Sequence, residues 1–86
     1  MKVYFSKNFD KGYKKLQRKI MRKADERIVL FSINPTDSIL NNHLLFGKYE
    51  GHRSINITGD LRAIYTMIDE DTALFVAIGT HSQLYG

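Results

Sequence analysis

Residues 52–80, HRSINITGDLRAIYTMIDEDTALFVAIGT, contain three runs that are rich in β-branched and aromatic residues and are separated by short polar turns. Such runs predict β-strands, which we place at residues 52–58, 61–68 and 73–80. Gly59-Asp60, with glycine first, suits a two-residue type II′ hairpin, and residues 69–72 suit a longer turn. Because connections this short join only antiparallel neighbours, the stretch predicts a three-stranded meander.

Upstream of the meander, the chain carries one apolar stripe with helical spacing. Its members are Phe9, Tyr13, Leu16, Ile20, Ala24, Ile28 and Phe31. Intervals of three and four residues place them on one side of a helix, and Asn34-Pro35 ends the pattern because proline disfavours helix at the preceding residue. A single helix of this length would measure about 39 Å, whereas a domain of this size is about 30 Å across. We therefore expect a break near residues 17–19 and a helical hairpin.

Two short segments complete the predicted fold. Residues 2–6, KVYFS, read as a strand in which Ser6 can cap the following helix, and residues 43–47, HLLFG, read as a short edge strand. The order predicts an α+β fold in which an N-terminal strand and a helical hairpin pack on an antiparallel meander. One face of the sheet buries the apolar stripe, and the other face is open unless another element covers it.

Length and composition limit the class of protein. With 86 residues the chain has room for one hydrophobic core, and we expect a single domain over residues 1–86. The absence of cysteine excludes disulfides and thiolate chemistry. No apolar stretch approaches the roughly 18 to 20 residues that cross a membrane, and the start of the chain lacks the apolar region of a signal peptide. We expect a cytoplasmic protein that does not bind membranes.

The chain is basic, with a net charge of +4 and a pI near 9.5, which favours polyanions or an acidic protein as partners. Its cations concentrate in the first third of the sequence, at Lys7, Lys11, Lys14, Lys15, Arg18, Lys19, Arg22 and Lys23. This run is equally typical of a solvated helix face and of a nucleic-acid footprint, and the sequence alone leaves both open. A domain this small is also marginally stable, so a partner that covers apolar surface would stabilise it.

Three histidines, His43, His52 and His81, fall in the second half of the chain near Arg53, Asp60 and Arg62. Histidine is the side chain best suited to proton transfer at neutral pH. In the predicted meander His81 ends the last strand, Asp60 lies in the first hairpin and His43 precedes the sheet, so we expect the three to meet at one rim. Each also has an ordinary explanation, since aspartate is common in turns and histidine at strand ends. The histidines lack a metal-ligand spacing such as H-x₃-H, so neither a metal nor a cofactor is predicted.

Two segments, residues 41–65 (NNHLLFGKYEGHRSINITGDLRAIY) and 78–86 (IGTHSQLYG), resemble bacterial toxins of the RelE and YafQ type. The family pattern is H-x-L-x-G, then G-x-R, D-x-x-x-x-Y and a closing G-[ST]-H-x-x-[LI]-[FY]. The resemblance implies a RelE-like fold and catalytic roles for His43, Asp60, His81 and Tyr85. Substrate binding by Arg53, Asn56 and Arg62 would support them. Family members carry a further histidine where this chain has Asn56, whose amide cannot exchange a proton at neutral pH.

The resemblance implies a ribosome-dependent messenger-RNA endoribonuclease, the toxin of a type II toxin-antitoxin module. It needs no metal or cofactor, and its partners would be an acidic antitoxin and the ribosome, through ribosomal RNA and the A-site message. Two alternatives remain open. A ParE-like toxin that inhibits gyrase would have the same fold without the histidines, and a catalytically decayed toxin would persist as a binding module or corepressor with its antitoxin. Asn56 favours the second alternative.

Overall fold

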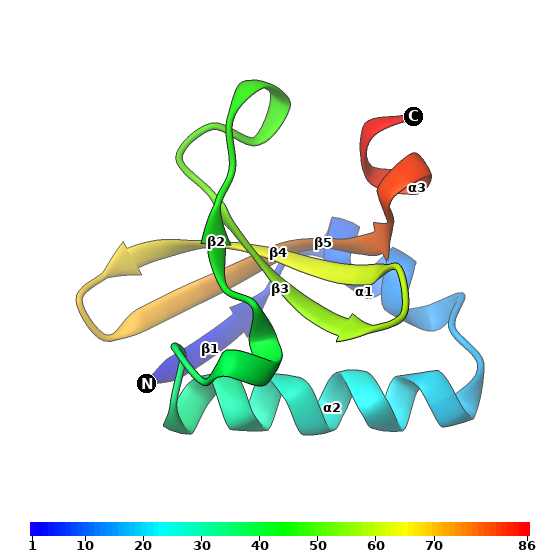
Figure 1. Cartoon of the computed structure of the whole chain (residues 1–86), viewed down its shortest axis with the longest axis horizontal. Helices are drawn as coiled ribbons and strands as arrows, with labels where there is room; N and C mark the ends of the chain where they lie inside the picture. Colours follow the sequence, from blue (N-terminus) through cyan, green and yellow to red (C-terminus); the bar gives the residue numbers. More distant parts are fainter.

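The computed structural model describes residues 1–86 and contains five strands, three helices and two short 3₁₀ turns (Figure 1). In chain order they are β1 (Lys2–Phe5), α1 (Lys7–Lys14), α2 (Arg18–Ile33), η1 (Ser38–Leu40), β2 (His43–Leu44), η2 (Gly47–Tyr49), β3 (Arg53–Thr58), β4 (Leu61–Asp69), β5 (Thr72–Thr80) and α3 (His81–Tyr85). The predicted α+β class is confirmed. Four of the predicted strands agree with the observed bounds to within one residue, whereas the edge strand predicted at residues 43–47 ends at Leu44, because η2 begins at Gly47.

The strands form one sheet in the order β1-β5-β4-β3-β2. Strands β3, β4 and β5 are the predicted antiparallel meander, and β2 adds to it beside β3. Thr58 pairs with Leu61 across the first turn, where Gly59 has φ +52, so the two-residue hairpin is confirmed. Strand β1 pairs in parallel with β5, from Lys2 opposite Thr72 onwards, which makes the sheet mixed.

The predicted helical hairpin is present: α1 ends at Lys14 and α2 begins at Arg18. Ser6 caps α1 by accepting a hydrogen bond from the backbone N–H of Phe9 at 3.1 Å. Gln17 is extended, with φ −66 and ψ 152, and so interrupts the helix without Gly or Pro. Gly12 lets α1 lie against β5, since a Cβ there would stand 2.7 Å from the carbonyl oxygen of Ile78. The break therefore allows α1 to pack on β5 while α2 packs on β3.

The main core lies between the helices and one face of the sheet, with α2 running beneath the strands in Figure 1. The stripe residues Phe9, Ala24, Ile28 and Phe31 are buried there, and the remaining three pack at its margin. Arg27 also donates from Nε to the carbonyl oxygen of Ile57 at 3.2 Å, which ties α2 to β3. The amphipathic pattern of the sequence thus corresponds to the observed core.

The opposite face, here called the α3 face, is partly covered by the end of the chain. Leu84 of α3 packs there with Leu45, Ile64 and Ala77. His81 is the first residue of α3 and does not end a strand as expected, because Thr80 and Gln83 form a capping box. The Thr80 hydroxyl accepts from the Gln83 N–H at 3.3 Å, and Gln83 Oε1 accepts from the Thr80 N–H at 2.8 Å. A T-x-x-Q spacing is a sequence signature of this cap.

Candidate functional site

Cross-strand pairing gathers polar side chains on the α3 face. Asn56 of β3 stands directly opposite Arg62 of β4, and Ser54 stands opposite Ile64. Because side chains alternate along a strand, Asn56 and Arg62 share the face of Ser54 and Ile64. The meander therefore brings the predicted Asn56 and Arg62 together, and it adds Ser54, which the sequence analysis did not identify.

Asp60 and His81 lie next to this polar pair, at the end of the sheet where the β3–β4 hairpin meets the start of α3. The Asp60 carboxylate accepts a hydrogen bond from the backbone N–H of His81 at 3.4 Å and lies 4.0 Å from the Arg62 guanidinium. Asp60 therefore contacts the backbone of His81 and not its ring. The imidazole is exposed, so it is free to meet a substrate.

Further aromatic rings lie beside His81, along and next to α3. The rings of His81 and Tyr85 are 4.9 Å apart, one helical turn from each other, and Tyr85 meets Tyr49 edge-on at 5.3 Å. Tyr49 in turn lies 6.2 Å from the ring of His52. The rings of His81 and Tyr85 are exposed and those of Tyr49 and His52 are half-buried. A partly exposed row of rings beside cationic and amide groups is suited to stack unpaired nucleotide bases. Tyr49 was missed by sequence reasoning because its contact with Tyr85 spans 36 residues of chain.

Three buried polar atoms on the α3 face lack a hydrogen-bond partner within the chain, namely Ser54 Oγ, Asn56 Oδ1 and Arg62 Nε. An unsatisfied buried donor or acceptor costs about 1–3 kcal/mol, and most folded proteins keep few of them. Here they are neighbours in the sheet, and Arg62 keeps part of its side chain exposed. Their clustering favours a surface built to receive polar groups of a ligand.

Two predicted site residues stand apart from this cluster. His43 lies on β2, three strand spacings or about 14 Å along the sheet from β5, so the expected meeting of three residues at one rim is wrong for His43. Its pairing with Ser54 still directs it to the α3 face, and Nδ1 donates to the carbonyl oxygen of Asn41 at 2.8 Å, leaving Nε2 free. Arg53 faces the helices instead, where Nε donates to Asn42 Oδ1 at 2.8 Å.

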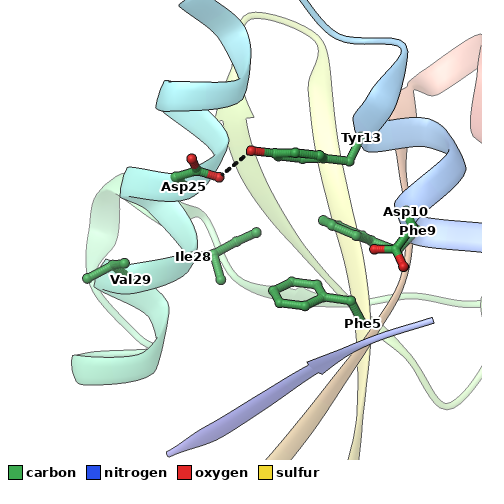
Figure 2. A pocket seen from close by; sticks show the side chains of 7 residues that line it. All are labelled: Phe5, Phe9, Asp10, Tyr13, Asp25, Ile28 and Val29. Atoms are coloured by element: carbon green, nitrogen blue, oxygen red, sulfur yellow. Dashed lines mark hydrogen bonds between the residues drawn. The ribbon is translucent and has the colours of Figure 1, made fainter. Parts of the chain in front are cut away.

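Two other surfaces border the fold. All cations of the basic run except Lys23 are exposed on or between α1 and α2. An apolar groove of about 380 Å³ lies between β1 and the two helices, lined by Phe5, Phe9, Asp10, Tyr13, Asp25, Ile28 and Val29 (Figure 2). The Tyr13 hydroxyl donates to Asp25 at 2.8 Å across the groove, and this bond raises the pKa of the phenol.

None of the helices has the length and the apolar composition that spanning a membrane requires. No cluster of three or more acidic, His or Cys side chains is arranged to hold a metal ion.

Comparison with known proteins adds to this geometry. A family model for the bacterial toxin of type II toxin-antitoxin system, YafQ, matches residues 1–86. The crystal structure of YafQ from E. coli strain BL21(DE3) is similar, with 25% identity, a TM-score of 0.83 and coverage of 98% of this chain and 97% of that chain. The toxin in the E. coli DinJ-YafQ complex gives 27% identity, a TM-score of 0.79 and the same coverage. A YoeB/ParE toxin from Agrobacterium tumefaciens shares the fold at 18% identity and a TM-score of 0.78, over 94% and 99% of the two chains. Curated protein sequences give no match.

Proposed function

Since the chain belongs to the YafQ family of bacterial toxins of type II toxin-antitoxin systems, we propose that it is an endoribonuclease that cleaves messenger RNA on the ribosome. The observation that carries the proposal is the cluster at the start of α3. There Asp60 joins the backbone of His81 to the guanidinium of Arg62, beside the unpaired amide oxygen of Asn56. A proton-transfer group, a cation and an amide on one open face match what RNA cleavage requires.

The proposed reaction uses the substrate's own 2′-hydroxyl as nucleophile. A base removes the 2′ proton, the O2′–P bond forms, the P–O5′ bond breaks, and an acid protonates the departing O5′. The products are a 2′,3′-cyclic phosphate and a 5′-hydroxyl. His81 and His43 are the proposed acid and base, without an assignment of which is which, and the α3 face is common to both. Because β2 lies three strand spacings, about 14 Å, from β5, the two histidines can act on one phosphate only if β2 and the start of α3 approach each other when RNA binds.

The remaining residues would stabilise and position the substrate. Arg62 faces the site and would neutralise charge on the phosphorane-like transition state. Asp60 holds both Arg62 and the first turn of α3, and Tyr85 would stack on a base. Arg53 is engaged with Asn42 on the opposite face, so its proposed contribution to substrate binding would be indirect.

Purified protein added to translating ribosomes is expected to cut messenger RNA and to leave 2′,3′-cyclic phosphate ends. Asn56→Ala should lower the cleavage rate only about fivefold, because one amide hydrogen bond is worth about 1 kcal/mol. Asn56→His should leave the rate unchanged or raise it. The measurement is a single-turnover cleavage time course on a defined message.

A folded wild-type protein that binds ribosomes and never cuts the message would instead support the decayed binding module, for which Asn56 is the specific indication. A loss of a hundredfold or more in Asn56→Ala, with the histidine variants active, would show that the chemistry lies elsewhere. The gyrase-inhibiting alternative leaves the exposed His81 without a role, and no residue of the site favours it.

We also propose an acidic antitoxin as partner, since the similar E. coli toxin is described in a DinJ-YafQ complex. Its support in this chain is the apolar groove between β1, α1 and α2, where Phe5 and Val29 are 44% and 57% exposed, beside a basic helix surface. The same basic surface is proposed to contact ribosomal RNA in the free toxin.

Co-expression with the cognate acidic protein is expected to give a complex of nanomolar or tighter affinity and a higher melting temperature of the toxin. Val29→Asp should weaken the complex by about a hundredfold, because a carboxylate in the apolar groove loses water on binding. The matched control is Ile39→Asp, a similarly exposed position outside the groove. Calorimetric titration measures both, and equal affinity for the two variants would remove the groove from the interface.

A further inference from the structure

The loop that contains η2 holds the C-terminal end of α3. Lys48 donates from Nζ to the carbonyl oxygen of Leu84 at 2.7 Å, and the Tyr49 hydroxyl donates to the same oxygen at 3.2 Å. From this geometry, and resting on the function proposed above, we propose that Lys48 and Tyr49 are positioning residues that clamp α3 so that His81 and Tyr85 are held toward the RNA. Neither residue is part of the predicted catalytic set.

Helix α3 needs such an anchor because it is only five residues long. Short helices are marginal in water, and the last carbonyl groups of any helix lack partners within it. Leu84 O is one of these carbonyls, and two donors from one loop converge on it. The Lys48 ammonium also suits the negative end of a helix.

The clamp reaches the reactive side chains through direct contacts. Tyr49 meets the Tyr85 ring edge-on, with centroids 5.3 Å apart and an interplanar angle of 89°, and Tyr85 lies 4.9 Å from the His81 ring. At the other end of α3, Thr80 and Asp60 hold the first turn. Restraint at both ends fixes the direction in which His81 and Tyr85 point, which is what pre-organised catalytic groups require.

The clamp is tested with Lys48→Ala, which removes one donor, and with Tyr49→Phe, which keeps the ring against Tyr85 but removes the other. Both should lower the single-turnover cleavage rate at saturating ribosomes about fivefold and leave ribosome affinity nearly unchanged. Amide hydrogen exchange at residues 83–86 should accelerate by a similar factor while exchange in β4 and β5 stays unchanged. Lys48→Arg, which keeps a cationic donor, should restore most of the rate.

The matched control is Lys2→Ala, which removes the same charge from an exposed position on β1. A purely electrostatic role of Lys48 would weaken ribosome binding in a salt-dependent way and would leave the saturated rate and the exchange of α3 unchanged, and that result overturns the clamp. Faster amide exchange in α3 with an unchanged cleavage rate would also overturn the clamp. Exchange is measured without substrate, so an inactive wild-type protein would refute the proposed nuclease separately from the clamp.

Discussion

His81→Ala is expected to lower the rate of messenger-RNA cleavage on ribosomes by about a hundredfold or more. Removal of a true general acid or base lowers the rate by about a hundredfold or more, whereas removal of one neutral hydrogen bond lowers it about fivefold. The His81 ring is exposed, and its contact with the ring of Tyr85 is the one the substitution removes. The hydrogen bond from its backbone N–H to Asp60 is kept by alanine, so we expect the variant to fold. Single-turnover cleavage of a defined message measures the loss, and an unchanged melting temperature confirms folding.

His43 provides a second test of the same chemistry. It lies on the edge strand β2, at the far side of the α3 face from His81. If His43 and His81 act on the same phosphate, His43→Ala should be nearly as slow as His81→Ala. The double variant should then be no slower than the slower single variant, since residues that act as one unit are not additive. Multiplicative losses would place His43 in a separate step such as binding. Full activity of His81→Ala would refute the proposed chemistry.

The parts of the fold that follow from local pattern could be predicted. The stripe from Phe9 to Phe31 indicates helices, and Gly59-Asp60 indicates a hairpin, because each depends on neighbours in sequence. The break near Gln17 was predictable only from the length that a single helix would need. The parallel pairing of β1 with β5 joins Lys2 to Thr72, 70 positions away. No periodicity in the sequence carries that information.

The same distinction applies to the site. Asn56 and Arg62 are six positions apart on one hairpin, so their meeting follows from the meander. The clamp of Lys48 and Tyr49 on α3 does not, because it depends on how the loop after β2 folds back over the sheet. His43 was misplaced for a related reason, since the sequence suggested a short edge strand without indicating which neighbour it would join. Helix α3 had a usable signal in its T-x-x-Q cap.

Phe75→Ala is expected to be the most destabilising single substitution in the core. Phe75 is fully buried at the centre of an aromatic cluster, with ring centroids at 5.2 Å from Phe31, 5.3 Å from Tyr65 and 5.9 Å from Phe9. Truncation of a buried phenylalanine costs about 3–5 kcal/mol, a large share of the roughly 5–15 kcal/mol that stabilises a typical domain. The melting temperature should fall by about 12 °C or more.

Phe46→Ala is the matched control, because Phe46 is 72% exposed and its loss should change stability by no more than about 0.5 kcal/mol. An antitoxin present at a concentration a hundred times its dissociation constant would stabilise the folded toxin by about 2.7 kcal/mol. This stabilisation is close to the smallest loss expected for Phe75→Ala. Phe75→Ala should therefore be poorly folded alone and largely recovered in the complex, as thermal unfolding with and without the partner would measure. Equal stability of the two phenylalanine variants would mean that the aromatic cluster does not hold the helices to the sheet.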